Sequence, residues 1–149
     1  DERLALVRKC GAAADEVIHA ATETVPDALE RRGVDGGPTL IFDAVCHPSI
    51  LEEAVRLAAP AARIGVLGFS SEPSSIVQAE LTKKELTLCA SRLNCAMFPQ
   101  VIEWIADGRV HPEHIVTHTL DFRDVARAFE LAERNPRESC KILLDFAAH

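Results

Sequence analysis

The residues with the most evident chemical capacity are Cys46 and His47, which follow an apolar run and precede Pro48. A thiol beside an imidazole could be a nucleophile with its base, a pair of metal ligands, or the rim of a cofactor cleft. Adjacent residues at the end of a strand point in different directions, whereas a catalytic pair needs converging side chains. We therefore expect a buried cysteine and a polar histidine at the mouth of a strand.

Three histidines, His111, His114 and His118, have the spacing H-x-x-H-x-x-x-H, which is compatible with metal binding. Pro112 and an expected change from turn to strand break any shared helical face, and zinc sites need tetrahedral convergence. Exposed histidines in a connecting segment are therefore the favoured interpretation.

Two basic residues lie at the ends of expected strands. Arg92 follows an apolar strand at its carboxyl end, where a charge needs a reason. Contact with a ligand and a surface salt bridge both remain open for Arg92, and the same choice applies to Lys141 at the start of a strand.

The composition limits the classes of function. The chain has 149 residues, of which 48% are hydrophobic and 26% charged, as in a single globular domain. A net charge of −7 argues against nucleic-acid and anionic-membrane binding, and no apolar run reaches the roughly 18 residues of a spanning helix. Five cysteines without a C-x-x-C pair favour a reduced, cytoplasmic protein.

Buried strands alternate with amphipathic helices along the chain. Strands are expected at 16–19, 39–45, 63–69, 86–90, 115–118 and 141–146, and helices at 4–9, 24–33, 48–59, 98–105 and 122–133. This order predicts an α/β fold, a partial Rossmann-like, doubly wound and mostly parallel sheet with helices on both faces. Ligands bind such sheets at the carboxyl ends of the strands, here 45–47, 67–70 and 89–92.

Four stretches resemble zinc-type medium-chain alcohol dehydrogenases in order and spacing. They are ERLALVRKCGAAADEVIHA, IFDAVCHPSILEEAVRLAAPAARIGVLGFSSEP, LTKKELTLCASRL and IVTHTLDFRDVARAFELAERNPRESCKILLDF. The chain is most similar to the branch that handles polyols, sugar acids and threonine. The resemblance covers the later part of such enzymes. It implies a single truncated cofactor-binding domain over residues 1–149, without the glycine-rich turn or the zinc-bearing catalytic domain. The chain also begins without methionine, in what looks like a helix in progress, so we expect a piece of a longer protein.

The resemblance implies an NAD or NADP site, with zinc only in the missing catalytic domain. The adenosine half would lie against Val45, Cys46 and His47. The nicotinamide would approach the ends of two further strands, at Leu67, Gly68, Phe69, Cys89, Ala90 and Ser91. Arg92 matches a basic residue near the cofactor or substrate, and Lys141 matches a basic residue that reaches the pyrophosphate. Arg3 lies near the expected ribose. No catalytic or metal-ligating residue is expected in the chain itself.

Three departures from the family pattern bear on this site. The family usually has glycine where this chain has Cys46, Ala61-Ala62 and Ala90. Glycine permits a positive φ or a close approach of backbone to ligand, so a side chain there could narrow the cofactor groove.

Two functions follow as hypotheses. The first is a fragment of an NAD(P)-linked alcohol, polyol or sugar-acid oxidoreductase, inactive alone and homo-oligomeric through residues 64–75. The alternative is a non-catalytic Rossmann-like module for ligand binding or assembly. Neither the substrate nor the choice between NAD and NADP can be read from these residues.

Overall fold

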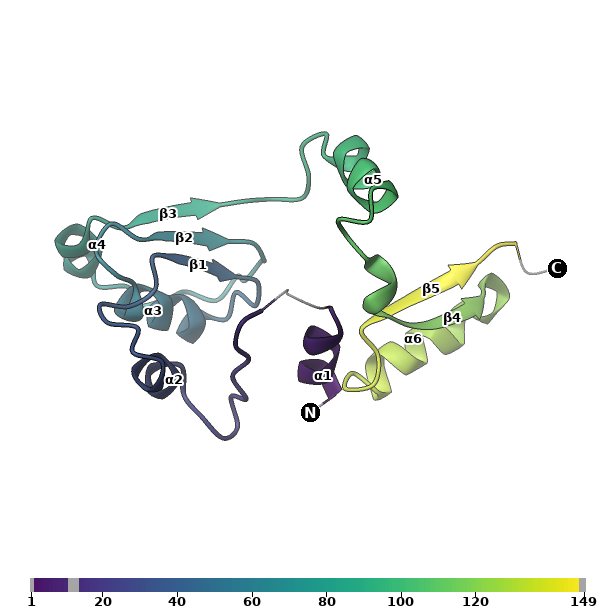
Figure 1. Ribbon diagram of the computed structural model, residues 1–149, viewed down its shortest axis with the longest axis horizontal. Helices are drawn as coiled ribbons and strands as arrows, with labels where there is room; N and C mark the ends of the chain where they lie inside the picture. The colour runs from purple at the N-terminus through teal and green to yellow at the C-terminus, as the bar shows by residue number, and fades with distance from the viewer. Residues whose placement is uncertain (1, 11–13, 148–149) are drawn as a thin grey trace. The chain divides into compact units, whose positions relative to one another are not determined.

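The computed structural model describes residues 2–10 and 14–147, which form two compact units (Figure 1). The central unit comprises residues 20–95, and the terminal unit combines residues 1–19 with residues 96–149. Both units contain parallel strands and helices, which confirms the predicted α/β class.

The central unit is a three-stranded parallel sheet with crossover helices. Its elements are α2 (Val25–Arg31), β1 (Leu40–Asp43), α3 (Pro48–Leu57), β2 (Arg63–Val66), α4 (Gln78–Lys84) and β3 (Thr87–Ala90). The strand order is β1-β2-β3, and Ile64 in the middle strand pairs with Ile41 on one side and Leu88 on the other. The carboxyl ends of all three strands therefore meet at one edge of the sheet.

Helix α3 supplies the core of the central unit. Pro48 suits its first turn because a fixed φ and a missing N–H cost nothing there. Ala54, Val55 and Ala58 are buried on the face predicted from the sequence, and they pack with Ile64, which is fully buried. The opposite face of the sheet differs from the expectation of two-sided burial, because Phe42 remains 64% exposed.

Lys84 and Ala61 connect the end of α3 and the turn after it to the end of α4. Lys84 Nζ donates to the carbonyl oxygens of Val55 (3.1 Å) and Arg56 (2.7 Å), which have no partners within the last helical turn. Ala61 adopts a φ of 59° and donates its amide to Lys84 O at 2.6 Å. The glycine-type backbone predicted at this turn is thus kept with an alanine side chain.

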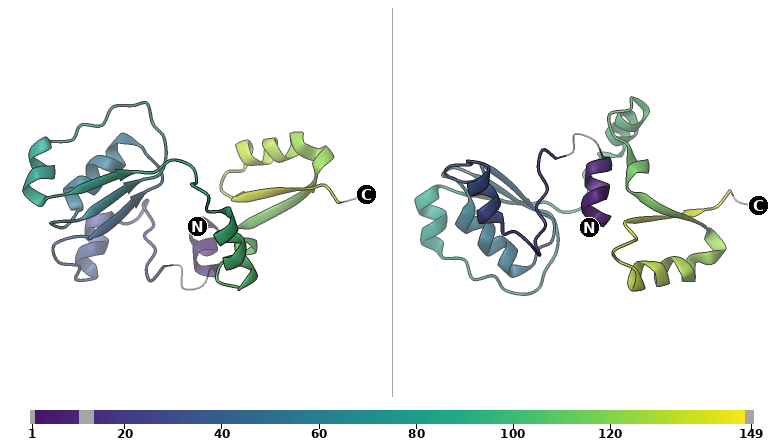
Figure 2. Two further views of the ribbon diagram at one scale, coloured as in Figure 1. Left: turned by 90° about the horizontal axis from the view of Figure 1, so that it is seen from above. Right: turned by 60° about the horizontal axis from the view of Figure 1, so that its bottom comes forward.

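The terminal unit pairs two strands beside one helix. Its elements are α1 (Glu2–Lys9), α5 (Phe98–Ala106), the 3₁₀ turns η1 (Pro112–His114) and η2 (Phe122–Asp124), β4 (Val116–Asp121), α6 (Val125–Arg134) and β5 (Lys141–Asp145). Strands β4 and β5 are parallel, with an irregularity between Val116 and His118. Helix α6 runs along this pair (Figure 2), and Phe122 stacks on Phe146 with ring centroids 4.9 Å apart.

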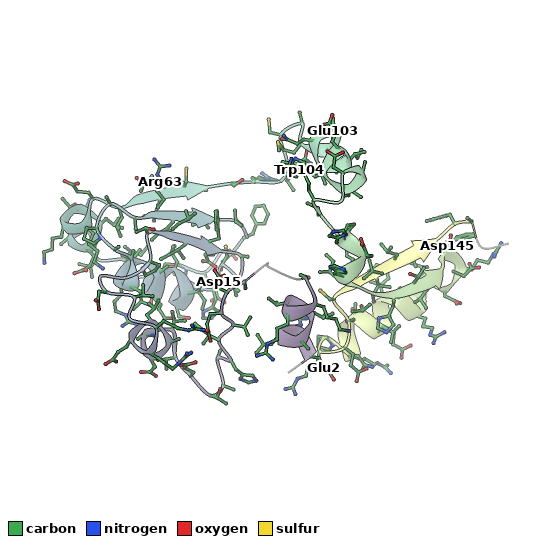
Figure 3. All side chains as sticks on the ribbon, viewed as in Figure 1. Glu2, Asp15, Arg63, Glu103, Trp104 and Asp145 are labelled. Atoms are coloured by element: carbon green, nitrogen blue, oxygen red, sulfur yellow. The ribbon has the colours of Figure 1, made fainter. Side chains whose placement is uncertain are left out.

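Helices α1 and α5 complete the terminal unit. Arg3 of α1 donates through Nε (3.2 Å) and Nη2 (2.5 Å) to the carbonyl oxygen of Pro136, in the connection between α6 and β5. On α5, Trp104 is half-buried and the guanidinium of Arg109 lies 5.4 Å from its ring centroid (Figure 3).

Two sequence predictions of secondary structure were wrong. Residues 16–19 form no strand, although their pattern predicted one. Helix α4 was not predicted, and its Leu81 packs against the buried cluster of the central unit. In both places, contacts beyond the local pattern decide whether an element forms.

Candidate functional site

The parallel register brings the predicted rim residues of the central unit together. The ladder continues past the strand ends, because Leu67 N donates to Asp43 O (2.9 Å) and Ser91 N donates to Val66 O (3.0 Å). The segments that follow the three strands therefore lie next to one another in space. These segments carry the predicted residues Val45, Cys46, His47, Leu67, Gly68, Phe69, Ser91 and Arg92, while Cys89 and Ala90 end β3 itself.

Asp43 builds the turn that follows β1. Its Oδ1 accepts the backbone N–H groups of Val45 (3.0 Å) and Cys46 (2.8 Å), and the residue is only 2% exposed. Its Oδ2 is buried without a hydrogen-bond partner among the described residues. This role of Asp43 was not predicted from the sequence. An acidic residue ending an apolar strand just before a turn was the available signal.

Cys46 occupies the left-handed region with a φ of 56°, the conformation for which the family pattern uses glycine. Its Sγ accepts the Gly68 N–H at 3.0 Å and lies 3.6 Å from Asp43 O as a donor. Only 8% of the residue is exposed. A Cβ at Gly68 would lie 2.9 Å from this sulfur, so the thiol fills the space that the glycine leaves.

His47 has a different set of partners from Cys46. Its Nδ1 lies 2.8 Å from Ser49 Oγ and accepts the Ser49 N–H at 3.4 Å, which caps the first turn of α3. The two neighbouring side chains therefore do not bond each other, and the geometry does not support a Cys–His catalytic pair. The expected buried cysteine is confirmed, and the polar histidine at the mouth of the strand is exposed.

A hollow of about 210 Å³ opens beside these residues. It is lined by Asp43, Cys46, His47, Leu51, Val66, Gly68, Phe69, Ser70, Glu72 and Ser74. Its polar side chains are two carboxylates, two serine hydroxyls and an imidazole, and its lining includes neither lysine nor arginine. Such a lining suits hydroxyl and amino groups better than phosphate. Ser70 lies in the predicted rim segment 67–70, whereas Glu72 and Ser74 were not predicted.

A larger hollow of about 530 Å³ lies against the outer side of α3 and the segment before α4. Glu52, Glu53 and Glu80 line it, and Glu52 Oε1 accepts the Ser75 N–H at 2.6 Å. None of the predicted site residues lines this hollow, so we place the candidate site at the strand ends.

Arg92 lies over the ring of Phe69, with its guanidinium carbon 5.5 Å from the ring centroid. Both side chains are exposed, Phe69 by 72%, and they come from the segments that follow β3 and β2. Because the two strands are neighbours, this contact joins two of the predicted rim segments directly.

The remaining predicted residues, Arg3 and Lys141, belong to the terminal unit. Arg3 holds the Pro136 carbonyl, which gives this side chain a structural role that the sequence did not reveal. Lys141 begins β5 opposite Val116, and its carbonyl oxygen accepts the Thr117 hydroxyl at 3.2 Å.

The histidine segment forms a surface cluster. His111 and His114 stack with ring centroids 5.2 Å apart, and His118 Nδ1 lies 3.1 Å from Thr117 Oγ1. The pKa of Glu113 is lowered, mainly by a backbone hydrogen bond and then by its hydrogen bond with His111 at 3.0 Å. Within residues 2–10 and 14–147, no group of three or more His, Cys, Asp or Glu side chains could hold a metal ion.

The family model of zinc-binding dehydrogenases matches residues 1–107. The chain belongs to the zinc-binding dehydrogenase family. Starvation-sensing protein RspB of Escherichia coli strain K12 is 48% identical over 147 residues, which cover 99% of this chain and 42% of that relative. The predicted resemblance to zinc-type alcohol dehydrogenases is therefore confirmed.

Solved structures agree with this zinc-binding dehydrogenase assignment. A short chain alcohol dehydrogenase (rspB) from E. coli CFT073, complexed with cofactor NADH, gives a TM-score of 0.90 at 48% identity, covering 98% of this chain and 42% of that chain. Alcohol dehydrogenase TADH from Thermus sp. ATN1 gives a TM-score of 0.76 at 30% identity, covering 85% of this chain and 37% of that chain. The chain thus spans about two fifths of the length of such relatives. Its Rossmann-like fold is confirmed by the same structures.

In the part of the chain that the structure describes, none of the helices is both long and apolar enough to cross a membrane.

Proposed function

We propose that residues 1–149 are the later part of the nicotinamide-cofactor domain of an NAD(P)-linked alcohol dehydrogenase. The observation that carries this proposal is the 48% identity, across 98% of the chain, to an alcohol dehydrogenase solved with NADH. The convergence of three strand ends on one hollow supports it, because cofactors bind such sheets at that edge.

The rim residues would divide between the two halves of the cofactor. Val45, Cys46 and His47, beside the polar hollow, would lie against the adenosine half, whose hydroxyl and amino groups match the lining. The nicotinamide half would approach the ends of β2 and β3, at Leu67, Gly68, Phe69, Cys89, Ala90 and Ser91. Arg92 and Lys141 would supply positive charge, and Arg3 would lie near the ribose. When bound, the nicotinamide would exchange a hydride with an alcohol carbon.

Cys46 is compatible with this site although the family pattern has glycine at its position. Its thiol is bonded by the Gly68 amide and its backbone keeps a positive φ. The side chain therefore packs between β1 and the end of β2, and the turn retains a glycine-type path. We infer that a dinucleotide still has room on the outer side of the turn.

Titration of the chain with NADH, followed by nicotinamide fluorescence, tests the proposal. We expect saturable binding that falls by at least about tenfold in Ser70→Trp, because Ser70 lines the hollow. Ser71→Trp is the matched control, since Ser71 is the exposed neighbour and does not line the hollow. Absence of NADH binding by the unmodified chain, or equal binding by both variants, would contradict the proposal.

We also propose that the 149 residues alone have no dehydrogenase activity. Zinc would be held by the catalytic domain of the complete enzyme, where it would polarise the oxygen of an alcohol, polyol or sugar acid. Assays of NAD and NADP reduction with polyols and sugar acids, with and without zinc, should show no turnover. Zinc-dependent turnover by the chain would contradict this part.

We also propose a homo-oligomeric state and a cytoplasmic location for the protein. We expect a homo-oligomer with residues 64–75 near the contact, which light scattering can measure. A monomer at all concentrations would count against it. All five cysteines are free, which supports a reducing, cytoplasmic location.

A further inference from the structure

The contact between Arg92 and Phe69 lies where the proposed nicotinamide half would approach. The guanidinium carbon is 5.5 Å from the ring centroid, within the range of a cation–π interaction. Phe69 follows β2 and Arg92 follows β3, and these strands pair along their whole length. The sheet therefore fixes the two backbones that bring this pair together.

The charge of Arg92 is not neutralised within the described chain. No carboxylate among residues 2–10 and 14–147 forms an ion pair with Arg92. Its guanidinium lies over the ring of Phe69 instead. A guanidinium stacked on a ring keeps its N–H donors at the edge of its plane, where they can meet two oxygens of an anion.

We propose that Phe69 is a positioning residue that holds the Arg92 guanidinium for an anionic group of a bound ligand. This inference rests on the proposed cofactor site and refines it. Phe69 then acts through Arg92, whereas the sequence resemblance implied a direct contact with nicotinamide. The anionic oxygens could belong to the cofactor's phosphates or to the carboxylate of a sugar-acid substrate.

Substitutions at Phe69 separate the ring from its bulk. Phe69→Leu removes the ring and keeps an apolar side chain, while Phe69→Tyr keeps the ring and is the matched control. The side chains of Phe69 and Arg92 are both exposed, so substitutions of these residues do not open a cavity in the core. Arg92→Gln removes the charge, and the double variant Phe69→Leu/Arg92→Gln tests whether the two residues act together.

Proton NMR of the chain without ligand tests the contact itself. In the unmodified chain and in Phe69→Tyr, the Arg92 Hδ and Hε resonances should be shifted upfield by the ring current. In Phe69→Leu they should return to the positions of a solvated arginine. Unshifted Arg92 resonances in the unmodified chain would overturn the inference before any ligand is added.

Two ligand titrations then distinguish the sources of the anion. The first uses NADH, and the second uses D-gluconate added to the NADH-saturated chain. We expect Phe69→Leu to lower the affinity for NADH or for gluconate by about two- to fivefold, as for the loss of an exposed cation–π contact. Phe69→Tyr should leave both affinities unchanged. An effect on NADH assigns the phosphates as the partner, and an effect on gluconate alone assigns the carboxylate.

The double variant decides between positioning and direct contact. If Phe69 acts through Arg92, Phe69→Leu adds no further loss in the Arg92→Gln background. Additive losses, or no loss in either titration, would overturn the inference while leaving the proposed function intact. A chain that binds no NADH would overturn both.

Discussion

The two units of this chain are built from similar elements but are packed very differently. In the central unit, a three-stranded sheet and α3 enclose a buried cluster of alanines with Val55 and Ile64. In the described part of the terminal unit, Ser139 is the only buried residue, and Phe129 of α6 is 67% exposed. The central unit has a third strand that packs with a helix, and it forms a core of its own. The two-stranded terminal unit does not form such a core in its described part.

A site of fixed geometry needs elements that are held by a core, which the central unit provides. The proposed cofactor edge consists of turns and strand ends of the central unit, in which Asp43 and Ile64 are both buried and Asp43 holds the turn after β1. The elements of the terminal unit are more exposed, and its two predicted site residues, Arg3 and Lys141, are both on the surface.

Removing a core side chain should have the largest effect, and only in the central unit. Ile64→Ala should lower the free energy of unfolding of that unit by about 2–4 kcal/mol, because it leaves a cavity in a fully buried position. Leu144→Ala, at a half-buried position of β5, should lower stability less in the terminal unit. Hydrogen exchange of peptides from the two units measures both losses. Equal losses would remove the contrast.

The turn after β1 should come next. Asp43→Ala should destabilise the central unit by about 1–3 kcal/mol, because two backbone N–H groups lose their acceptor. Asp43→Asn keeps an acceptor oxygen and should lose less. Urea unfolding followed by circular dichroism compares the two variants. If Asn were as damaging as Ala, the carboxylate charge would matter more than the two hydrogen bonds.

At position 46, glycine should give a more stable protein than alanine. Cys46→Ala loses the thiol that accepts the Gly68 N–H and still has to adopt a positive φ. Cys46→Gly loses the same thiol but relieves about 1 kcal/mol of left-handed strain, so it should be the more stable of the two. Thermal unfolding of the pair measures this order. Alanine above glycine would show that the turn does not hold residue 46 in this conformation.

The smallest effect should be a pH dependence at one surface pair of the central unit. A hydrogen bond from Arg31 lowers the pKa of Glu23, with Arg31 Nε 2.8 Å from Glu23 Oε1. A pKa lower in the folded than in the unfolded state stabilises the protein above the unfolded pKa, and this is lost as pH falls through the folded pKa. Carboxyl carbon NMR should show the lowered pKa in the unmodified chain and its return toward the usual value in Arg31→Gln. An unchanged titration in Arg31→Gln would contradict the assignment.

Glu113 in the terminal unit is the comparison for that titration. Its pKa is also lowered, first by a backbone hydrogen bond and second by His111. His111→Gln should therefore shift the Glu113 pKa only partly, because the backbone contribution remains. A complete return to the usual value would mean that the imidazole is the main cause.

The sequence predicted the elements better than it predicted their partners. The apolar runs around β1, β2 and β3 and the periodicity of α3 and α6 each appear in the structure, with shorter bounds for the strands. Segment 16–19 has a strand-like pattern, but a strand exists only where a neighbour accepts its hydrogen bonds. Local pattern carries no information about such a neighbour.

The meeting of the three strand ends at one edge was predictable, but the contacts between their residues were not. The rule that ligands bind at carboxyl ends of parallel strands located 45–47, 67–70 and 89–92 from sequence alone. The bond between Cys46 and Gly68 joins residues 22 positions apart, and Arg3 and Pro136 are 133 apart. Such pairings depend on the folded path of the chain, so they could not follow from spacing. Whether these residues bind a cofactor stays a prediction for the NADH titration.

The division of the chain also sets an order of completion during synthesis. Residues 20–95 are continuous, so every strand and helix of the central unit has been made once that segment has left the ribosome. The contact between Arg3 of helix α1 and the carbonyl oxygen of Pro136 can form only after Pro136 has been synthesised. Contacts between distant positions close late because the intervening chain must be ordered first. Helix α1 precedes the central unit in the chain, but we expect it to reach its place after the hollow at the strand ends has formed.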